Sequence, residues 1–329
     1  MKKITPPHAR NAMNTIPTIF NEKITPYTVI GGKERAVSSK ISAVVLNRRG
    51  HYERRDFFQE LEKKGFDNVI SIESSKTRYD VEELSARFPF ARFIMSENQI
   101  NTGQQINLAA SETDSPLFLV LWNDMKIISG GCAQIMAERL INENVFKRLC
   151  TVPILINSRF DTLPCMTTPV TQKKKLLTIT NEPRHEGHLS LFPFQGVGIY
   201  DRLRFIQMGG YDPDLNNFHW QLMDFGMRSW LWGEETALSI QLKFSCEDEL
   251  PVEDSTIENS YRRFYLKNLA PVLKNDYAKL PYYLFPAFKI KSGIDFFTGL
   301  EEFRQCREWV KKNKYRWRRD AKGVVDLWD

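Results

Sequence analysis

The sequence predicts an α/β fold built on a mainly parallel central sheet that is flanked by helices. Apolar runs of strand length alternate with helical patterns from residue 41 to residue 122, and this alternation is typical of βαβ units. Polar residues follow these runs, as expected where parallel strands end at a common edge. The chain can also bury a large core, because 42% of its 329 residues are apolar and 12% are aromatic.

The alternation begins after an N-terminal stretch of different character. Residues 1–40 contain four prolines and no sustained periodicity, so they predict an extended arm or a short leading strand. The run ISAVVLN that follows is a buried-strand pattern, and Gly65 is a suitable residue to end the next helix. The expected strands are 41–47, 68–72, 91–95 and 117–122, and the expected helices between them are 52–64, 81–87 and 102–111.

The second half of the chain has longer polar intervals. Its expected strands are 151–156, 175–179 and 194–200, with a loop between the first two, and its expected helices are 202–207 and 221–232. Beyond these, a helical and basic-aromatic composition sets the C-terminal residues apart. The predicted regions are an N-terminal arm (1–40), a main α/β domain (41–256) and a helical C-terminal extension (257–329).

Charge and cysteine content exclude several classes of protein. The net charge of +6 suits a protein that handles anionic nucleotides or touches anionic lipid, but it is too small for a dedicated nucleic-acid binder. The five cysteines form no CxxC pair, so neither a disulfide framework nor a zinc site is expected. The sequence has no secretory h-region and no bilayer-length apolar run. The expected location is therefore cytoplasmic, with peripheral contact at the inner face of the membrane left open.

Polar side chains at the strand ends are the first functional signal. The residues that follow the first, second and fourth expected strands are Asn47 with Arg48, Glu73 with Ser75, and Asn123 with Asp124. Glu73 can accept hydrogen bonds from a base or a ribose. Asp124 is the oxygen ligand in the expected place for a divalent cation that neutralises a diphosphate. We therefore expect a nucleotide site at this edge of the sheet.

Six motifs occur in a fixed order between residues 44 and 228. They are VVLNRRG ending at Gly50, IESS at 72–75, ENQINTGQQINLAA at 97–110, LVLWNDM ending at Met125, GGYD at 209–212 and DFGMR at 224–228. This order resembles that of the GT-A-fold glycosyltransferases, in particular the large inverting rhamnosyl- and galactosyltransferase family. The resemblance covers the chain from about residue 41 to residue 233, and it implies a GT-A-type nucleotide-diphospho-sugar transferase fold.

The resemblance also implies ligands and site residues. It points to a nucleotide-diphospho-sugar donor, an unknown glycan or lipid-linked acceptor, and a Mn²⁺ or Mg²⁺ ion bound by Asp124. The implied nucleotide-binding residues are Asn47, Arg48, Glu73, Ser75, Asn101, Gly103, Asn107, Asn123 and Asp124. The implied acceptor-site residues are Gly210, Tyr211 and Asp212. An inverting transfer needs a base for the acceptor hydroxyl, and Asp224 and His219 are the candidates.

Two positions depart from the family's pattern. Trp122 stands where the family has the first Asp of its metal motif, and Gln221-Leu222 stands where it has Glu-Asp. A second hypothesis is therefore a non-catalytic GT-A-like protein that binds a nucleotide or a partner. Asp224 would then form an ordinary helix ion pair with Arg228, one turn further on.

The C-terminal tail allows two interpretations. Apolar residues between Phe296 and Val310 recur near helical spacing, which predicts a helix packed on its own domain. The run Lys311–Arg319 that follows mixes six cations with Tyr315 and Trp317. Such a run also favours contact with an anionic membrane surface.

Overall fold

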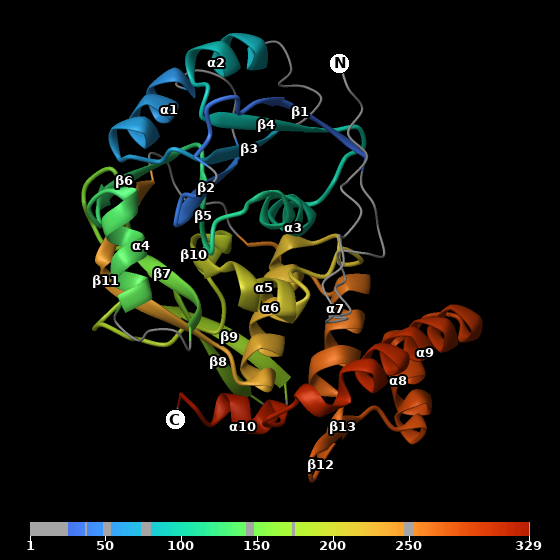
Figure 1. Cartoon of the computed structure of the whole chain (residues 1–329). Coiled ribbons are helices and arrows are strands. Elements are labelled where there is room, and N and C mark those ends of the chain that lie inside the picture. The colour runs from blue at the N-terminus through green and yellow to red at the C-terminus, as the bar shows by residue number, and fades with distance from the viewer. Residues whose placement is uncertain are drawn as a thin grey trace.

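A nine-stranded mixed sheet forms the centre of the computed structural model, in the strand order β1-β4-β3-β2-β5-β10-β7-β11-β6. The model describes residues 26–36, 38–48, 54–73, 80–142, 148–172, 175–246 and 253–328. Figure 1 shows helices packed around this sheet and a C-terminal helical region beside it. All six residues of β2 are buried, as expected for a central strand that is covered on both faces.

The first half of the sheet follows the predicted βαβ pattern. Its strands are β2 (Ile41–Leu46), β3 (Val69–Glu73), β4 (Ala91–Ser96) and β5 (Leu117–Trp122), and its helices are α1 (Arg54–Lys63), α2 (Val81–Arg87) and α3 (Thr102–Glu112). The four strands are parallel, and Val44 in β2 pairs with Ile70 in β3 and Val120 in β5. β1 (Tyr27–Gly31) runs antiparallel to β4, so the predicted arm does contain a short leading strand.

The second half of the sheet is mixed. β10 (Gly198–Asp201) lies antiparallel between β5 and β7 (Arg148–Ile156), and β11 (Glu235–Cys246) runs parallel to β7. β6 (Met125–Ser129) pairs antiparallel with β11 at the edge. Six strands therefore share one direction and β1, β6 and β10 oppose it, which confirms the prediction of a mainly parallel sheet.

Several elements of the second half differ from the expected ones. The loop expected between residues 156 and 175 contains β8 (Met166–Gln172), which forms a separate two-stranded sheet with β9 (Lys175–Asn181). Its sequence MTTPVTQ hides the strand, because it includes a proline and several polar residues. The sequence patterns also gave no signal for β6, β11 or α4 (Ala133–Asn142).

Two helices beside β10 carry the second group of motifs. α5 (Arg202–Met208) ends at Gly209, and α6 (Phe218–Trp232) starts three residues earlier than expected. The Asn217 side chain accepts from the Trp220 N–H and caps α6, while Gly233 ends the helix at a φ of 88°. The ring of Phe205 in α5 meets Phe118 and Tyr200 of the sheet edge-on, at 5.2 and 5.5 Å between centroids, which packs α5 against the sheet.

The C-terminal residues form a helical region that packs on α6. Its elements are α7 (Asn259–Phe264), a π-helical turn (Tyr265–Leu269), β12 (Val272–Lys274), β13 (Tyr277–Lys279), α8 (Phe285–Ser292), α9 (Phe296–Asn313), a 3₁₀ turn (Lys314–Arg316) and α10 (Ala321–Val325). The helix predicted from the apolar residues between Phe296 and Val310 is thus confirmed. No helix in the described part of the chain is both long and apolar enough to cross a membrane. The predicted region limits at 40/41 and 256/257 stay predictions.

The basic-aromatic tail lies against the body of the protein. Trp309 stacks on Trp232 at 5.8 Å, and Trp317 meets the same ring edge-on at 5.7 Å. Arg316 lies 4.8 Å above Trp232, and the Arg318 N–H donates to the carbonyl oxygen of Leu231. These contacts match the interpretation of the tail as a helix and turn packed on their own domain.

Candidate functional site

The carboxyl ends of β2 and β5 bring three of the predicted residues together. The Arg48 N–H donates to Oδ1 of Asn123 at 3.0 Å, and its guanidinium lies 3.4 Å from Oδ2 of Asp124. Both strands end at the same edge because they are parallel neighbours in register. Arg48 and Asp124 are each partly exposed, with 15% and 12% of the side chain accessible.

Trp122 and Gln195 complete this group, which we call the edge cluster (Arg48, Trp122, Asn123, Asp124 and Gln195). The Arg48 guanidinium lies 4.1 Å above the Trp122 ring and donates to Oε1 of Gln195 at 3.1 Å. The Trp122 Nε1–H in turn donates to the Gln195 carbonyl oxygen at 3.0 Å. The Trp122 ring is therefore a platform that orients the arginine.

Gln195 was not predicted from the sequence. It lies in a 3₁₀ turn (Phe194–Gly196) with a φ of 54°, a left-handed conformation that is uncommon for a residue with a side chain. A single glutamine before a glycine carries no sequence signal for this geometry. Only the closure of β10 beside β5 brings it to the edge cluster.

Asp124 has one oxygen that a cation could bind. Its Oδ1 is buried and has no hydrogen-bond partner within the described ranges, whereas Oδ2 faces Arg48. The described residues contain no group of three or more His, Cys, Asp or Glu that could hold a metal ion. A magnesium-like ion is often held by one or two carboxylates together with substrate phosphates. Among the described residues, Asp124 Oδ1 would therefore hold such an ion, and the ion would neutralise part of the charge of a bound diphosphate.

A buried thiol lies close to this carboxylate. Cys246 at the end of β11 pairs across the sheet with Met125, the residue after Asp124. Burial, and then the nearby negative charge of Asp124, raise the pKa of Cys246 to about 12. The thiol is therefore neutral at physiological pH, as expected for a cysteine of the core.

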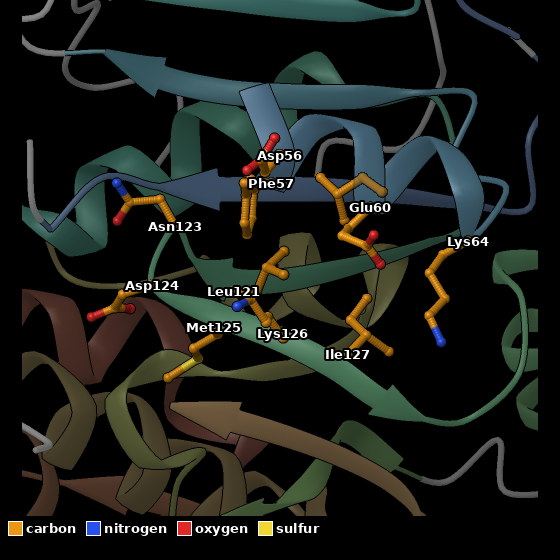
Figure 2. Close-up of a pocket in the computed structure, with 11 residues that line it drawn as sticks. Asp56, Phe57, Glu60, Lys64, Leu121, Asn123, Asp124, Met125, Lys126 and Ile127 are labelled. Atoms are coloured by element: carbon orange, nitrogen blue, oxygen red, sulfur yellow. The ribbon is translucent and has the colours of Figure 1, made fainter. Parts of the chain in front are cut away.

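A cleft of about 190 Å³ opens next to Asp124 between α1 and β6. Figure 2 shows Asn123 and Asp124 at one end of this cleft and Lys64 at the other. Pockets for drug-sized ligands usually span about 300–1,000 Å³, so this cleft has room for one sugar or phosphate group. Ser75, one of the predicted nucleotide ligands, lies outside the described residues.

Glu73 and Asn47 are at the predicted edge but hold the sheet together. The Glu73 side chain has no exposed surface, receives a hydrogen bond from Ser71 at 2.6 Å and forms an ion pair with Arg54 at 2.5 Å. The Asn47 side chain donates to the Ile72 carbonyl oxygen at 2.7 Å. For Glu73 to bind a nucleoside, Arg54 would first have to move away from it.

The Asn101–Asn107 motif joins α3 to the turn before α6. Asn107 exchanges two hydrogen bonds of 2.8 Å with the backbone of Tyr211, and the Gly103 N–H donates to the Gln221 side chain at 3.0 Å. A Cβ on Gly103 would lie 2.7 Å from that of Tyr211, so only glycine fits here. Asn101 caps α3 and also donates to the carbonyl oxygen of Leu215. These contacts give the predicted nucleotide motif a structural role within the fold.

Asp212 of the predicted acceptor site and the candidate base Asp224 lie in a second group of charges, the interior cluster (Asp212, Asp224, Arg228, Arg263 and Lys267). Lys267 Nζ lies 2.7 Å from Asp212 and 2.9 Å from Asp224, and both aspartates are buried. Arg228 pairs with Asp224 at 3.0 Å, four residues along the same helix, as the alternative interpretation predicted. Arg263 pairs with Asp212 at 2.8 Å.

The interior cluster keeps its carboxylates charged. Burial alone would raise the pKa of Asp224, but Lys267 and Arg228 hold it below its ordinary value. The pKa of Asp212 is lowered in the same way, because Lys267 and Arg263 outweigh the effect of burial. Tyr211 is also fully buried, and its hydroxyl lies 2.9 Å from that of Tyr200. Gly210 contributes its carbonyl oxygen to Arg228 at 2.6 Å. These contacts favour a structural role for Gly210, Tyr211, Asp212 and Asp224. A catalytic base must reach the acceptor hydroxyl, whereas these groups are engaged inside the fold.

His219 is in a different situation in the first turn of α6. Its Nδ1 lies 2.8 Å from Oε2 of Glu253, and 8% of its surface is exposed. A carboxylate can only accept, so this contact favours the tautomer in which Nε2 keeps its lone pair. The neighbouring Phe218 packs on Trp122 with ring centroids 6.4 Å apart, which places this turn beside the edge cluster. Glu253 was not predicted from the sequence.

Comparison with solved structures identifies the fold. No protein-family model and no curated protein sequence matches the chain. The crystal structure of GalNAc-T7 with UDP, GalNAc and Mn²⁺ superposes with a TM-score of 0.57 at 14% identity over 88% of this chain. The fold is of the GT-A type. This confirms the predicted fold class.

The matches cover parts of longer chains and are distant in sequence. The alignment includes 56% of the GalNAc-T7 chain, so this protein spans little more than half of its length. The structure of S. aureus TarS residues 1–349 with UDP-GlcNAc matches at 10% identity over 81% of this chain and 71% of the TarS chain, with a TM-score of 0.46.

Proposed function

We propose that this protein is a glycosyltransferase that moves a sugar from a nucleotide-diphospho-sugar to an unknown glycan or lipid-linked acceptor. The observation that carries the proposal is the edge cluster at the carboxyl edge of a GT-A sheet. It contains a cation, an amide and a carboxylate oxygen that has no hydrogen-bond partner in the described part of the chain. Solved neighbours of this fold were crystallised with UDP or a UDP-sugar. Ligands of open α/β sheets bind at this edge.

In this proposal Arg48 neutralises part of the charge of the donor diphosphate. Its guanidinium is already oriented by Trp122 and Gln195, so little reorganisation is needed when the phosphates bind. Asp124 would hold a Mn²⁺ or Mg²⁺ ion through Oδ1, and the ion would stabilise the diphosphate as it leaves. Asn123 fixes the backbone of Arg48 and so positions the guanidinium.

His219 is the better placed of the two predicted bases. Glu253 holds its Nδ1, and the free lone pair on Nε2 can take the proton of an acceptor hydroxyl. Asp224 would have to leave Lys267, Arg228 and Asn268 before it could act. We therefore propose His219 as the base and Glu253 as its positioning residue.

The second candidate function is a non-catalytic GT-A-like protein that binds a nucleotide or a partner. It is favoured by the number of motif residues that the fold itself uses, since Glu73 and Asp224 are both fully engaged in buried ion pairs. Leu222, at the position of the family's usual base, is also completely buried. A fold can keep these residues after the chemistry is lost.

A binding experiment followed by a turnover experiment tests the two functions. Thermal shift with UDP, GDP, dTDP and CMP, each with Mn²⁺ or EDTA, should reveal at least one nucleotide that raises the melting temperature. Arg48→Gln should reduce that rise, because binding that is about tenfold weaker stabilises the folded state less. Lys311→Gln, which changes an exposed cation far along the chain, should leave it unchanged. No stabilisation by any nucleotide would refute both the transferase and the nucleotide-binding form of the alternative.

Turnover separates the transferase from the binding protein. With the nucleotide that binds, a panel of NDP-sugars should show hydrolysis or transfer by the wild type. His219→Gln should lower kcat strongly, and Glu253→Gln should shift the pH dependence of kcat/KM while leaving KM unchanged. Binding without turnover across the whole donor and acceptor panel would assign the non-catalytic function.

We also propose where the protein meets its acceptor. A lipid-linked acceptor would suit a protein that contacts the inner face of a membrane, and the net charge of +6 is compatible with anionic lipid.

A further inference from the structure

The Gln195 side chain has a hydrogen-bond donor that the described part of the chain does not use. Its Oε1 accepts from the Arg48 guanidinium at 3.1 Å. A guanidinium has donors only, so the amide must turn its oxygen towards Arg48 and its NH₂ group away from it. This nitrogen, Nε2, has no hydrogen-bond partner among the described residues, and it is not sealed off from solvent. Gln195 as a whole is 6% exposed, so a nearly buried side chain offers a donor to a ligand at the edge cluster.

The backbone at Gln195 also has a conformation that its side chain does not favour. Its φ of 54° is in the left-handed region, where a glycine is at no disadvantage and a glutamine is strained. Two contacts of the edge cluster hold it there, since the Gln195 carbonyl oxygen accepts from the Trp122 Nε1–H and Oε1 accepts from Arg48. Residues held in this way are concentrated at active sites and ligand clamps.

The turn that contains Gln195 lies between the groups proposed to handle the diphosphate and the acceptor. On one side Gln195 contacts Arg48, the proposed partner of the diphosphate. On the other side the next residue, Gly196, packs so closely on the ring of Phe218 that a Cβ would be 3.2 Å from Cζ. Phe218 precedes His219, the proposed base, in the first turn of α6. When a base-assisted hydroxyl attacks a sugar from the side opposite the leaving group, the sugar lies between the two.

We propose that Gln195 binds the sugar of the donor by donating a hydrogen bond from Nε2 to one of its hydroxyl groups. Arg48 holds Oε1, so the amide acts towards the sugar as a donor. A neutral amide suits a neutral hydroxyl, whereas the guanidinium meets the charge of the diphosphate. Gln195 thus determines specificity, because a sugar without that hydroxyl leaves the Nε2 group unpaired. The inference rests on the proposed nucleotide-diphospho-sugar donor, and it does not depend on turnover.

Two other roles of Gln195 make different predictions. In the first, Gln195 acts on the ligand only by holding the guanidinium of Arg48. In the second, Nε2 donates to a phosphate oxygen. In both cases a change at Gln195 weakens the binding of the free nucleotide diphosphate as much as that of the nucleotide sugar. A contact with the sugar weakens the binding of the nucleotide sugar alone.

Calorimetry on the full chain separates these roles. UDP-glucose, UDP-N-acetylglucosamine, GDP-mannose and dTDP-rhamnose are each compared with the free diphosphate of the same nucleotide, and the ratio of the two dissociation constants is measured. For the nucleotide sugar that the wild type binds best, Gln195→Met should lower the affinity relative to the free diphosphate by about three- to tenfold, as expected for the loss of one neutral hydrogen bond. Any effect through Arg48 changes both dissociation constants and cancels in their ratio.

Two matched variants make the result specific. Arg48→Gln should weaken the binding of both ligands and leave their ratio within about twofold of the wild type, because it removes the cation and keeps Gln195. Gln195→Gly should lower the ratio as Gln195→Met does, and it also removes the backbone strain at this position. Both Gln195 variants should still bind the free diphosphate, which shows that the site is folded.

Donors that each lack a single hydroxyl of the preferred sugar identify the contact. One of these deoxy donors should bind the wild type about three- to tenfold more weakly than the parent nucleotide sugar does. The same deoxy donor should bind Gln195→Met within about twofold of the parent, because the hydrogen bond is already absent in that variant. A residue that only positions Arg48 would not produce this coupling.

Three results would overturn the inference. The first is an equal loss of affinity for the free diphosphate and the nucleotide sugar in both Gln195 variants, which would assign Gln195 to Arg48 or to a phosphate. The second is an unchanged ratio in both variants. The third is a wild type that binds a free diphosphate and none of the nucleotide sugars. In each of these cases the proposed nucleotide site would stand, whereas a wild type that binds no nucleotide at all would remove the proposed function together with this inference.

Discussion

The edge cluster and the interior cluster contain the same chemical groups in different environments. Each pairs an arginine with an aspartate, Arg48 with Asp124 at the edge and Arg228 with Asp224 inside. At the edge the two groups are 3.4 Å apart and partly exposed, and one carboxylate oxygen has no hydrogen-bond partner among the residues that the structure describes. Inside, the pair is 3.0 Å apart with no exposed surface, and Lys267 and Asn268 bind the other oxygen of the carboxylate.

The difference shows which charges can bind a ligand. A carboxylate whose two oxygens are both bonded to buried cations has no oxygen left to bind a ligand. Opening its ion pairs would also leave charges uncompensated in the core. A partly hydrated pair at the end of two strands can exchange its partners at small cost. The interior cluster therefore stabilises the junction of α6 with the C-terminal region, and the edge cluster is the one that we propose to bind a substrate.

The largest expected effect comes from removing the shared cation of the interior cluster. Lys267→Met should lower the free energy of unfolding by about 3–5 kcal/mol, because Asp212 and Asp224 would then face each other with less compensation. Urea denaturation measures the change, and the exposed Lys311→Met is the control, with an expected change within about 0.5 kcal/mol. Similar losses in the two variants would contradict the role given to the interior cluster.

The pH dependence of stability should belong to the same cluster. The pKa values of Asp212 and Asp224 are lowered in the folded state, so their stabilisation is present above the unfolded value near 3.9 and is lost as the pH falls below it. We expect the free energy of unfolding to drop by at least about 2 kcal/mol between pH 5 and pH 2. Arg48→Gln should show the same drop, and Lys267→Met a smaller one.

The Glu73→Gln variant tests whether Glu73 binds the nucleotide or stabilises the core. Glu73→Gln should cost about 1–3 kcal/mol of stability, because the ion pair with Arg54 is fully buried and the amide replaces only part of it. Nucleotide affinity, measured by calorimetry, should change less than twofold. A large loss of affinity with little loss of stability would instead restore the predicted contact between Glu73 and the nucleoside.

Replacement of Arg48 should change nucleotide affinity more than stability, the reverse of the result expected for Glu73. Arg48→Gln should weaken nucleotide binding about tenfold, which corresponds to about 1.4 kcal/mol, because the diphosphate loses its oriented cation. Stability should change by less than about 0.5 kcal/mol, since the pair with Asp124 is partly exposed. Calorimetry and urea denaturation on the same preparation separate the two quantities.

The smallest expected effect is that of Asp124 on nucleotide binding. Asp124→Asn should leave the affinity measured in EDTA within about twofold of the wild type and remove the increase produced by Mn²⁺, because Oδ1 is the oxygen that we propose as the ligand of the ion. Its melting temperature should stay within about 1 °C of the wild type. An equal response to Mn²⁺ in both proteins would exclude Asp124 as a metal ligand.

The sequence by itself determined the fold class and predicted the sheet edge at which we propose the site. Buried runs such as 41–47 and 117–122 alternate with amphipathic helices, and this local pattern is sufficient to predict βαβ units with their strand ends at one edge. Asn123, Asp124 and Arg48 could be predicted on this basis, because each directly follows such a strand. The mixed second half was predicted less well, since MTTPVTQ and the long β11 have no regular alternation.

Only the tertiary structure decided which of the polar residues are available to a ligand. Asn107 and Asp124 are both polar motif residues in the sequence. The Asn107 side chain, however, forms two hydrogen bonds with the backbone of Tyr211, 104 residues away. Lys267 neutralises Asp212 and Asp224 from 55 and 43 residues further along the chain, and Gln195 meets Arg48 across a separation of 147. Such partners leave no local pattern, because hydrogen bonds and ion pairs depend on distance in space and not on distance along the chain.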